Sequence, residues 1–297
     1  MLQKLKKLVS QPAFRAQPFA VASRCVAWVF CVATKSSHAF QLTDAGERVC
    51  VPANLRFTSL TTYILRDWAE TELRCLDMFL KRGDTFLDIG ANIGLFTLKA
   101  ARIVGARGTV VSVEPGAAAL TQLRKNLALN AYPQVRLVAM AVSDTVGKAA
   151  LHHIELGNDP QAYSLIHDGS DVSAECVETT TLDDLMEQHG VGNVHCIKID
   201  VEGAEPLVMR AGMKTLTGYK PMVIFEINAP PALYAGTEAL PFQMFTDMGY
   251  RIFRMERGKL REVLFLPAGP GNLVAIHPEG AQPVATSLHE RTSIGLG

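Results

Sequence analysis

The chain has 297 residues, of which 48 % are hydrophobic, and its 29 Lys and Arg balance its 29 Asp and Glu. This composition suffices for a buried sheet with helices on both faces, and we expect one α/β domain with an extension. Without net charge, a general attraction to nucleic acid is disfavoured. Six scattered cysteines without a C-x-x-C pair, and no secretory leader, predict reduced thiols in a cytoplasmic protein and argue against structural zinc.

Residues 1–50 are predicted to form an N-terminal extension, and residues 51–297 the main domain. A lysine-containing stretch at 2–8 precedes an apolar stretch at 18–34 that Arg24 interrupts. The apolar stretch is too short and too charged for a bilayer-spanning helix, and polar residues break the apolar region that a signal peptide requires. Three roles stay open for the extension: peripheral membrane contact, a lid or oligomer contact, and a plain surface segment.

From residue 85 the pattern alternates strand and helix, as a parallel sheet with crossover connections requires. The first strand is predicted at Thr85–Ile89, with Asp88 near its carboxyl end, and the helix that follows at Leu95–Val104. Glycine tolerates φ > 0 and lacks a Cβ, so a ligand can lie against the main chain in a glycine-rich turn. The connecting turn contains Gly90, Asn92 and Gly94.

The second strand, at Thr109–Val113, ends in Glu114, which is 26 residues after Asp88. That separation is close to the roughly 20 residues between a glycine turn and the acidic residue that holds a ribose. In open α/β sheets, ligands bind outside the carboxyl ends of the strands. The two strand ends therefore predict a site for a nucleoside cofactor.

The spacing of the turn indicates which nucleoside cofactor. A dinucleotide site would carry G-x-G-x-x-G, with the diphosphate on the following helix N-terminus. Here the spacing is Gly90-x-Asn92-x-Gly94 behind Asp88, and a carboxylate so close would repel a diphosphate but suit a cation. We therefore predict S-adenosylmethionine, which offers an ammonium group, a sulfonium centre and a ribose diol, in preference to the dinucleotide of an oxidoreductase.

The rest of the chain continues the alternation. Further helices are predicted at 117–129, 205–216 and 240–248, and another runs through Met186 from the capping pattern of Thr181 and Asp184. Further strands are predicted at 135–142, 194–199, Met222–Ile227, 250–255, 263–266 and 272–276. The last of these suit the antiparallel closing pair of a seven-stranded sheet. Two alternating segments, 149–155 and Ala174–Thr180, predict an inserted hairpin at about 148–180 on the acceptor side.

Four separated motifs in this chain arrive in a specific order. They are GDTFLDIGANIG at 83–94, VEP at 113–115, AVSD at 141–144 and IKIDVEGAE at 197–205. Together they closely resemble the FkbM family of S-adenosylmethionine-dependent methyltransferases, over about residues 63 to 278. The resemblance implies a class I methyltransferase fold: a Rossmann-like, seven-stranded, mostly parallel sheet with helices on both faces and an antiparallel closing strand. For most members it also implies methylation of a hydroxyl on a sugar, polyketide or related metabolite.

Roles follow for the residues that would bind the cofactor. Asp88 is expected to take the ammonium group, directly or through water, and Glu114 to accept hydrogen bonds from both ribose hydroxyls. The resemblance implies adenine contacts after the third strand, although Asp144 also fits plain turn chemistry. The predicted cofactor-binding residues are Glu70, Asp88, Gly90, Asn92, Gly94, Glu114, Ala141, Val142, Asp144 and Asp200.

An alcohol acceptor needs a base within hydrogen-bonding reach of its hydroxyl. The predicted catalytic residues are Asp200, Glu202 and Glu226, with Glu205 as a further acid near the strand ends. Crowded carboxylates raise one another's pKa, which would make one of them a better base. Alternatively, the carboxylates could bind a divalent metal that acidifies the acceptor hydroxyl. For Glu202 and Glu205, a third reading is that they only complement a helix dipole.

The favoured function is O-methylation of a hydroxyl on a sugar, glycan or secondary metabolite. Asp200 is followed by Val201-Glu202-Gly203 and not by the two prolines and aromatic residue of enzymes that methylate base nitrogens, so nucleic acid is not expected as a partner. A catalytically inactive cofactor-binding protein and a methyltransferase for a nitrogen acceptor are the alternatives. The expected partner is a small-molecule or carbohydrate acceptor, and the oligomeric state is left open.

Overall fold

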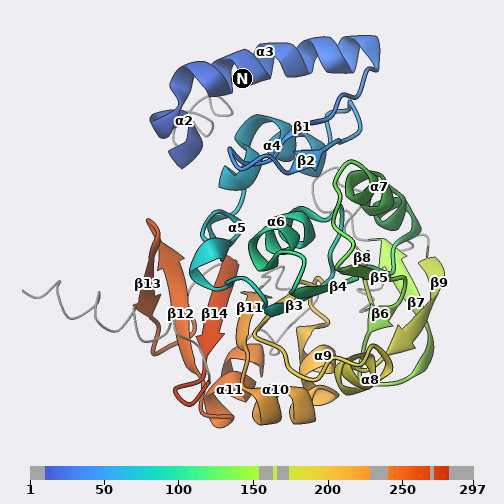
Figure 1. The fold of residues 1–297 in the computed structure, drawn as a ribbon, viewed down its shortest axis with the longest axis vertical. Helices are drawn as coiled ribbons and strands as arrows, with labels where there is room; N and C mark the ends of the chain where they lie inside the picture. The colour runs from blue at the N-terminus through green and yellow to red at the C-terminus, as the bar shows by residue number, and fades with distance from the viewer. Residues whose placement is uncertain (1–10, 154–162, 166–173, 228–239, 268–270, 281–297) are drawn as a thin grey trace, which may run out of the picture.

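The structure of the chain is a computed structural model that describes residues 11–153, 163–165, 174–227, 240–267 and 271–280. An eight-stranded sheet lies at its centre, in the order β13-β12-β14-β11-β10-β3-β4-β5 (Figure 1). The strands are β3 (Thr85–Ile89), β4 (Thr109–Val113), β5 (Val135–Val138), β10 (Cys196–Ile199), β11 (Met222–Ile227), β12 (Arg251–Glu256), β13 (Lys259–Glu262) and β14 (Gly271–Ile276).

The strand order identifies the fold class. Strands β5, β4, β3, β10 and β11 are parallel neighbours, whereas β14 runs antiparallel to both β11 and β12. Numbered along the chain and without β13, the order from β5 to β12 reads 3-2-1-4-5-7-6, with the seventh strand reversed. This is the class I methyltransferase arrangement, so the predicted fold class is confirmed, and β13 adds an eighth strand at the edge.

Helices cover both faces of the sheet, as predicted, because alternate strand side chains point to opposite faces. Phe86 and Val110 belong to a core on the face of α5 (Thr71–Arg74) and α6 (Leu95–Val104), whereas their neighbours Leu87 and Val111 belong to the opposite core. The opposite core includes α8 (Leu182–Gln188), α9 (Glu205–Arg210), α10 (Met213–Tyr219) and α11 (Leu240–Asp247). Helix α7 (Ala117–Ala128) lies beside α6 (Figure 1).

The predicted strand at 263–266 was wrong, because a tight hairpin places the strand earlier. Glu256 at the end of β12 pairs with Lys259 at the start of β13. The two residues between them, Arg257 and Gly258, have φ values of 51° and 76°. A two-residue turn with both φ values positive matches the twist of adjoining antiparallel strands, so it fixes the return at this point.

Two other predicted elements are divided in the structure. The strand predicted at 135–142 ends at Val138, and Ala141–Val142 forms a separate strand, β6, in another sheet. The helix predicted at 205–216 breaks before Gly212 into α9 and α10. There, a side chain from α8 caps the new helix start, since the Asp183 carboxylate accepts hydrogen bonds from the Lys214 and Thr215 amides.

The inserted segment forms a four-stranded sheet in the order β6-β9-β7-β8, with β7 (Gly147–His153), β8 (Tyr163–Ser164) and β9 (Ala174–Thr180). Strands β7 and β9 pair antiparallel, as the predicted hairpin requires. Residues 154–162 and 166–173 of this insertion, which include the predicted end of its first segment at Glu155, lie outside the described residues. At Thr181, the predicted cap is present, since its hydroxyl accepts a hydrogen bond from the Asp184 amide.

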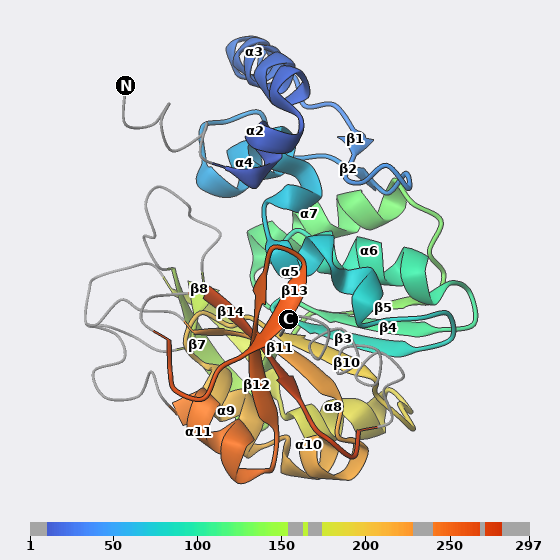
Figure 2. The ribbon, with the colours of Figure 1, turned by 90° about the vertical axis from the view of Figure 1, so that its left-hand side faces the viewer.

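The N-terminal elements lie at one end of the molecule, with α3 outermost (Figures 1 and 2). They are α2 (Pro12–Ala16), α3 (Pro18–Thr34), β1 (Phe40–Gln41), β2 (Arg48–Val49), α4 (Phe57–Leu65) and the short 3-10 turn η1 (Arg66–Trp68), whereas the 3-10 turn η2 (Leu76–Met78) follows α5 and belongs to the core of the main sheet. Val21 of α3 packs with Ile64 and Leu65 of α4, and Trp28 packs with Ile93. Among the described residues, none of the helices has both the length and the apolar character needed to cross a bilayer.

The boundary predicted at residue 50 falls within a segment that packs on α6 and is hydrogen-bonded to α7. Leu42 and Val49, in and beside the β1–β2 hairpin, pack on Leu98 of α6. The Cys50 amide donates to the Asn126 side chain of α7. The division into an extension and a main domain stays a prediction, and the hairpin's contacts are made with the main domain.

We expect Gly90→Ala to be markedly more destabilising than Gly83→Ala. Both glycines have positive φ, 82° and 89°, so both substitutions cost about 1–2 kcal/mol of left-handed strain. An added Cβ at Gly90 would also lie 1.8 Å from the Asp200 carbonyl oxygen, whereas nothing lies within 4 Å at Gly83. The overpacking should add about 1–3 kcal/mol. Urea unfolding of the two variants measures the difference, and equal losses would contradict this contact.

Candidate active site

Three strand ends are joined by backbone hydrogen bonds at the glycine turn. The Gly90 and Ala91 amides both donate to the Val113 carbonyl, at 3.0 and 2.9 Å, and the Asp200 amide donates to the Ile89 carbonyl at 3.0 Å. Because a Cβ at Gly90 would overlap the Asp200 carbonyl, this glycine is required for close approach of two strand ends. The turn therefore fixes the carboxyl ends of β3, β4 and β10 relative to one another.

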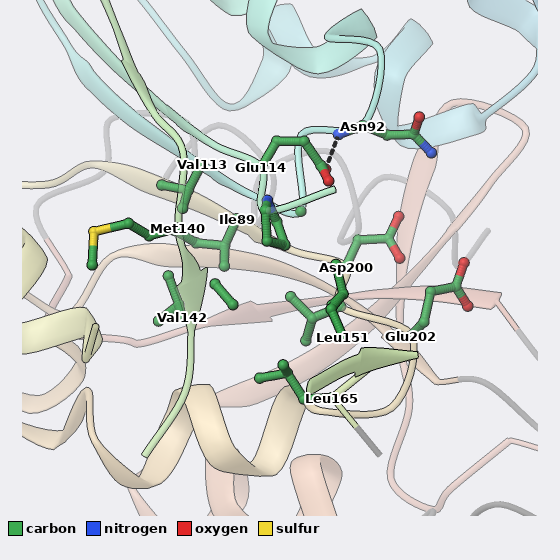
Figure 3. Close-up of a pocket in the computed structure, with 14 residues that line it drawn as sticks. Ile89, Asn92, Val113, Glu114, Met140, Val142, Leu151, Leu165, Asp200 and Glu202 are labelled. Carbon is green, nitrogen blue, oxygen red and sulfur yellow. Dashed lines mark hydrogen bonds between the residues drawn. The ribbon is translucent and has the colours of Figure 1, made fainter. Parts of the chain in front are cut away.

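Glu114, at the end of β4, is held in place by backbone amides. Its buried carboxylate accepts a hydrogen bond from the Asn92 amide at 2.7 Å (Figure 3) and another from the Gly116 amide at 2.8 Å. Burial raises the pKa of Glu114 to about 7, although both amides favour the charged form. Each oxygen retains acceptor capacity, so the carboxylate can still bind two hydroxyls.

A cavity lies beside Glu114, and we call it the Glu114 cavity. Apolar side chains of Met140, Val142, Leu151 and Leu165 form one side of it, and the acidic side chains of Asp200 and Glu202 lie on the other (Figure 3). The insertion, which the sequence predicted on the acceptor side, contributes Leu151 and Leu165 to the cavity wall.

The residues of the Glu114 cavity fit an adenosine-containing cation. Apolar side chains suit a base, the fixed Glu114 carboxylate suits a ribose diol, and the acids suit positive charge. In addition, the buried Asn92 Oδ1 has no hydrogen-bond partner among the described residues. An unpaired buried acceptor is unfavourable, so a donor from a ligand would satisfy it.

A second cavity adjoins the first and is called the Lys198 cavity. Gly90, Asn92 and Asp200 line both cavities, so they mark the junction. The Lys198 cavity is also lined by Glu70, Asp88, Phe96 and Lys198 from the main domain and by Gln11, Phe57, Thr58, Thr61, Thr62 and Leu65 from the N-terminal elements. The N-terminal elements thus contribute directly to the site.

Asp88 contributes to the Lys198 cavity from the carboxyl end of β3. Its buried carboxylate accepts a hydrogen bond from the Thr97 hydroxyl at 2.5 Å, and Thr97 Oγ1 lies 2.8 Å from Ser112 Oγ. Burial raises the pKa of Asp88 to about 6, against the effect of the Thr97 hydrogen bond. Among its described side-chain contacts, Asp88 has no ion pair, so the carboxylate is free to bind a cationic group.

Lys198 is the residue that the sequence interpretation missed. Its side chain is only 2 % exposed, and its Nζ lies 2.5 Å from Asp200 Oδ2 and 4.7 Å from the centroid of the Phe96 ring. Burial alone would lower the pKa of Lys198, but the carboxylates of Asp200 and Glu70 outweigh burial and raise it. A lysine between two isoleucines of a buried strand was the available signal.

Asp200 and Glu226 share a hydrogen bond, and each affects the pKa of the other. Burial would raise the pKa of Asp200, but Lys198 and a hydrogen bond from Glu226 outweigh it and lower that pKa. Burial and the Asp200 charge both raise the pKa of Glu226. At neutral pH, the pair therefore keeps the charge on Asp200 and a proton on Glu226.

Glu202 completes an acidic group with that pair. Oxygens of Asp200, Glu202 and Glu226 lie within 4.8 Å of one another, a spacing that a divalent cation's ligands could adopt. Glu202 has a φ of 51° in the loop after β10. Glu205 closes this loop by accepting hydrogen bonds from the Val201 and Gly203 amides at 3.1 and 3.2 Å. Glu205 therefore supports the loop structurally.

The remaining predicted residues divide into two groups. Ala141 and Val142 line the Glu114 cavity, and Glu70 lines the Lys198 cavity, where burial raises its pKa to about 7. Gly94 and Asp144 are absent from both linings: a Cβ at Gly94 would meet Leu123, and Asp144 is exposed. Apart from these two, the structure gathers the predicted residues around one junction.

Comparison with known proteins gives the family. The profile of the methyltransferase FkbM domain matches residues 88–252, more than half of the chain. This chain belongs to the FkbM methyltransferase family. It is also 27 % identical over 181 residues to the 2-O-methyltransferase NoeI of Sinorhizobium fredii (strain NBRC 101917 / NGR234), a match that covers 57 % of this chain and 72 % of that protein.

Solved structures resemble this chain at lower sequence identity. Methyltransferase FkbM from Methylobacillus flagellatus KT is 13 % identical, with a TM-score of 0.42, and the match covers 85 % of this chain and 59 % of that one. Precorrin-6y C5,15-methyltransferase from Geobacter metallireducens GS-15 is 13 % identical, with a TM-score of 0.41 and coverage of 69 % and 86 %. At such scores, the fold class of this FkbM methyltransferase rests on its own strand order.

We expect Glu114→Ala to weaken S-adenosylmethionine binding at least about tenfold, since contacts to a diol would be lost. Isothermal titration calorimetry measures the dissociation constant. Asp144→Ala is the matched control, because it removes an exposed carboxylate that lies outside both cavities. Unchanged affinity in Glu114→Ala, or an equal loss in Asp144→Ala, would contradict the assignment.

The ligand-free protein should lose stability as the pH rises from about 5 to 7.5, in part through Glu114. Between its ordinary pKa of 4.5 and its folded value of about 7, the folded state holds a proton that the unfolded chain has released. This contribution is complete below pH 4.5 and is lost as the pH passes 7. Glu114→Gln should therefore flatten the pH dependence of the free energy of unfolding.

Urea unfolding at several pH values measures that slope. Glu187→Gln on the exposed side of α8 is the control and should keep the wild-type slope. A Glu114→Gln slope equal to that of the wild type would mean that Glu114 is not the titrating group.

Proposed function

We propose that this FkbM methyltransferase transfers the methyl group of S-adenosylmethionine to a hydroxyl oxygen of a sugar, glycan or secondary metabolite. The observation that carries the proposal is the position and charge of Asp200. Asp200 lines both cavities at their junction and is kept ionised by Lys198, so a carboxylate is ready to accept a proton there. The relative that is a 2-O-methyltransferase supports an oxygen acceptor.

The cofactor would occupy the Glu114 cavity with its adenosine and extend across the junction. Bound S-adenosylmethionine would supply an electrophilic methyl carbon. Glu114 would hold the ribose hydroxyls, and the side chains of Met140, Val142 and Leu151 would cover the base. Asp88 and Glu70 would face the ammonium group from the Lys198 cavity.

A carboxylate of the acidic group would accept the proton of the acceptor hydroxyl. The acceptor oxygen forms a bond to the methyl carbon as the carbon–sulfur bond breaks, and the hydroxyl proton passes to a carboxylate. Asp200 is the proposed acceptor of that proton because it is ionised, whereas the proton on Glu226 keeps that residue neutral. Lys198 fixes the orientation of Asp200, so alignment is set before the acceptor binds.

A divalent metal is the second way to acidify the hydroxyl. Asp200, Glu202 and Glu226 could together hold a cation once Glu226 releases its proton. In that case a chelator would abolish turnover and magnesium would restore it. With the carboxylate base, the same chelator should leave turnover unchanged.

We expect Asp200→Asn to bind S-adenosylmethionine within about twofold of the wild type and to lose turnover by about 100-fold or more, because the amide cannot accept the proton. A labelled-methyl transfer assay over sugars, nucleotide-sugars and lipid-linked glycans measures turnover. Asp247→Asn, at an exposed position on α11, makes the same chemical change outside the site and should retain full activity. Full activity of Asp200→Asn would assign the base elsewhere.

The same assay separates the alternatives. Cofactor binding by calorimetry with no methyl transfer to any acceptor would favour a catalytically inactive cofactor-binding protein. Transfer only to amine acceptors would favour a nitrogen methyltransferase.

A further inference from the structure

Helix α3 carries a stripe of apolar residues, interrupted by one serine, on the side that faces away from the other described elements. The stripe follows helical spacing at i, i+3, i+4, i+7, i+10, i+11 and i+14. Its residues, which we call the outer stripe, are Phe19, Ala22, Ser23, Val26, Val29, Phe30 and Ala33. The large members are among the most exposed apolar side chains described: Phe19 is 89 % exposed, Val26 73 %, Val29 68 % and Phe30 67 %.

Packing among the described residues does not account for the outer stripe. The opposite side of α3 already buries Val21, Trp28 and Cys31 against the residues beneath it. The one charged residue within α3, Arg24, donates from Nη1 to the Ile64 carbonyl at 3.2 Å, on the packed side. An ordinary surface helix places its charged residues toward water, and α3 does the reverse.

The charge of the N-terminal segment indicates what kind of surface binds the outer stripe. Residues 1–43 contain six Lys and Arg and no Asp or Glu, so this segment has a formal net charge of +6. Because the whole chain has no net charge, the remaining residues have a net charge of −6. In the described part of this segment, Arg15 and Lys35 flank α3 and are exposed. Basic residues beside an apolar helix face complement a surface of anionic lipid, in which the apolar side chains enter the headgroup boundary. Two copies of a +6 segment would instead repel each other.

We propose that α3 lies flat on an anionic phospholipid surface and inserts its outer stripe, so that this end of the protein is a membrane-binding face. At 17 residues, α3 would extend about 25 Å along the membrane plane. The views of Figures 1 and 2 agree with such a position, because α3 is the outermost element and α4 separates it from the central sheet. The proposal does not depend on the acceptor or on turnover.

The test is flotation of the full chain with vesicles of phosphatidylcholine that contain phosphatidylglycerol, compared with vesicles of phosphatidylcholine alone. We expect binding to the anionic vesicles and at least about tenfold weaker binding to the neutral ones. The double substitution of Val26→Glu and Phe30→Glu should reduce anionic-vesicle binding by at least about tenfold. Arg15→Gln with Lys35→Gln should weaken it while leaving the stripe intact.

The matched control places the same two charges on another exposed apolar pair. Leu264 and Phe265, after β13, are 74 % and 82 % exposed, and Leu264→Glu with Phe265→Glu should bind vesicles like the wild type. Each variant's S-adenosylmethionine affinity, measured by calorimetry, verifies that it is folded.

Three outcomes would overturn the proposal. The first is equal binding of the wild type and the α3 variant, and the second is wild-type binding that does not depend on anionic lipid. The third is a doubled mass in solution that the α3 variant alone abolishes, without vesicle binding, which would assign the outer stripe to a second copy of the chain.

Discussion

The buried ion pair between Lys198 and Asp200 is the interaction around which the site is organised. A lysine in the middle of a sheet can remain charged only beside carboxylates, and Asp200 can remain charged among acids only beside that lysine. The pair orients Asp200 at the junction of two cavities. It also helps to determine where the proton lies, because burial and the charge on Asp200 together raise the pKa of Glu226.

One lysine does not balance the acids that face these cavities. Glu70, Asp88 and Glu114 all have pKa values raised by burial, and Lys198 lies in ion-pair contact with Asp200. An unliganded site of this kind is negatively charged or holds extra protons, and both conditions are relieved when a cation enters. A sulfonium cofactor with an ammonium group has the charge that such a site would bind most favourably.

The N-terminal elements connect this site to the outer face of the protein. Trp28 of α3 packs with Ile93 in the turn beside Asn92, and α4 lines the Lys198 cavity. The inner side of α3 thus packs against the turn that contains Asn92, while its outer stripe is exposed.

The sequence by itself determined the central strands, the glycine turn and the acids at the strand ends. These follow from local rules, since β3, α6, β4 and β11 have the predicted bounds, and motif spacing placed Asp88, Glu114 and Asp200 at neighbouring strand ends. The divided helix at Gly212 and the β12–β13 hairpin depended on a cap from α8 and on a two-residue turn, so hydrophobic periodicity did not reveal them.

Only the tertiary structure decided how those residues act. Lys198 and Asp200 are only two residues apart, but the fold buries Lys198 and places the pair beside Glu70, and it leaves Asp144 exposed outside the cavities. It also placed Leu151 and Leu165 of the insertion in the cavity wall and left the outer stripe of α3 exposed. Spacing along a chain fixes where a strand ends, but pKa, charge and burial depend on residues that the fold brings together from distant segments.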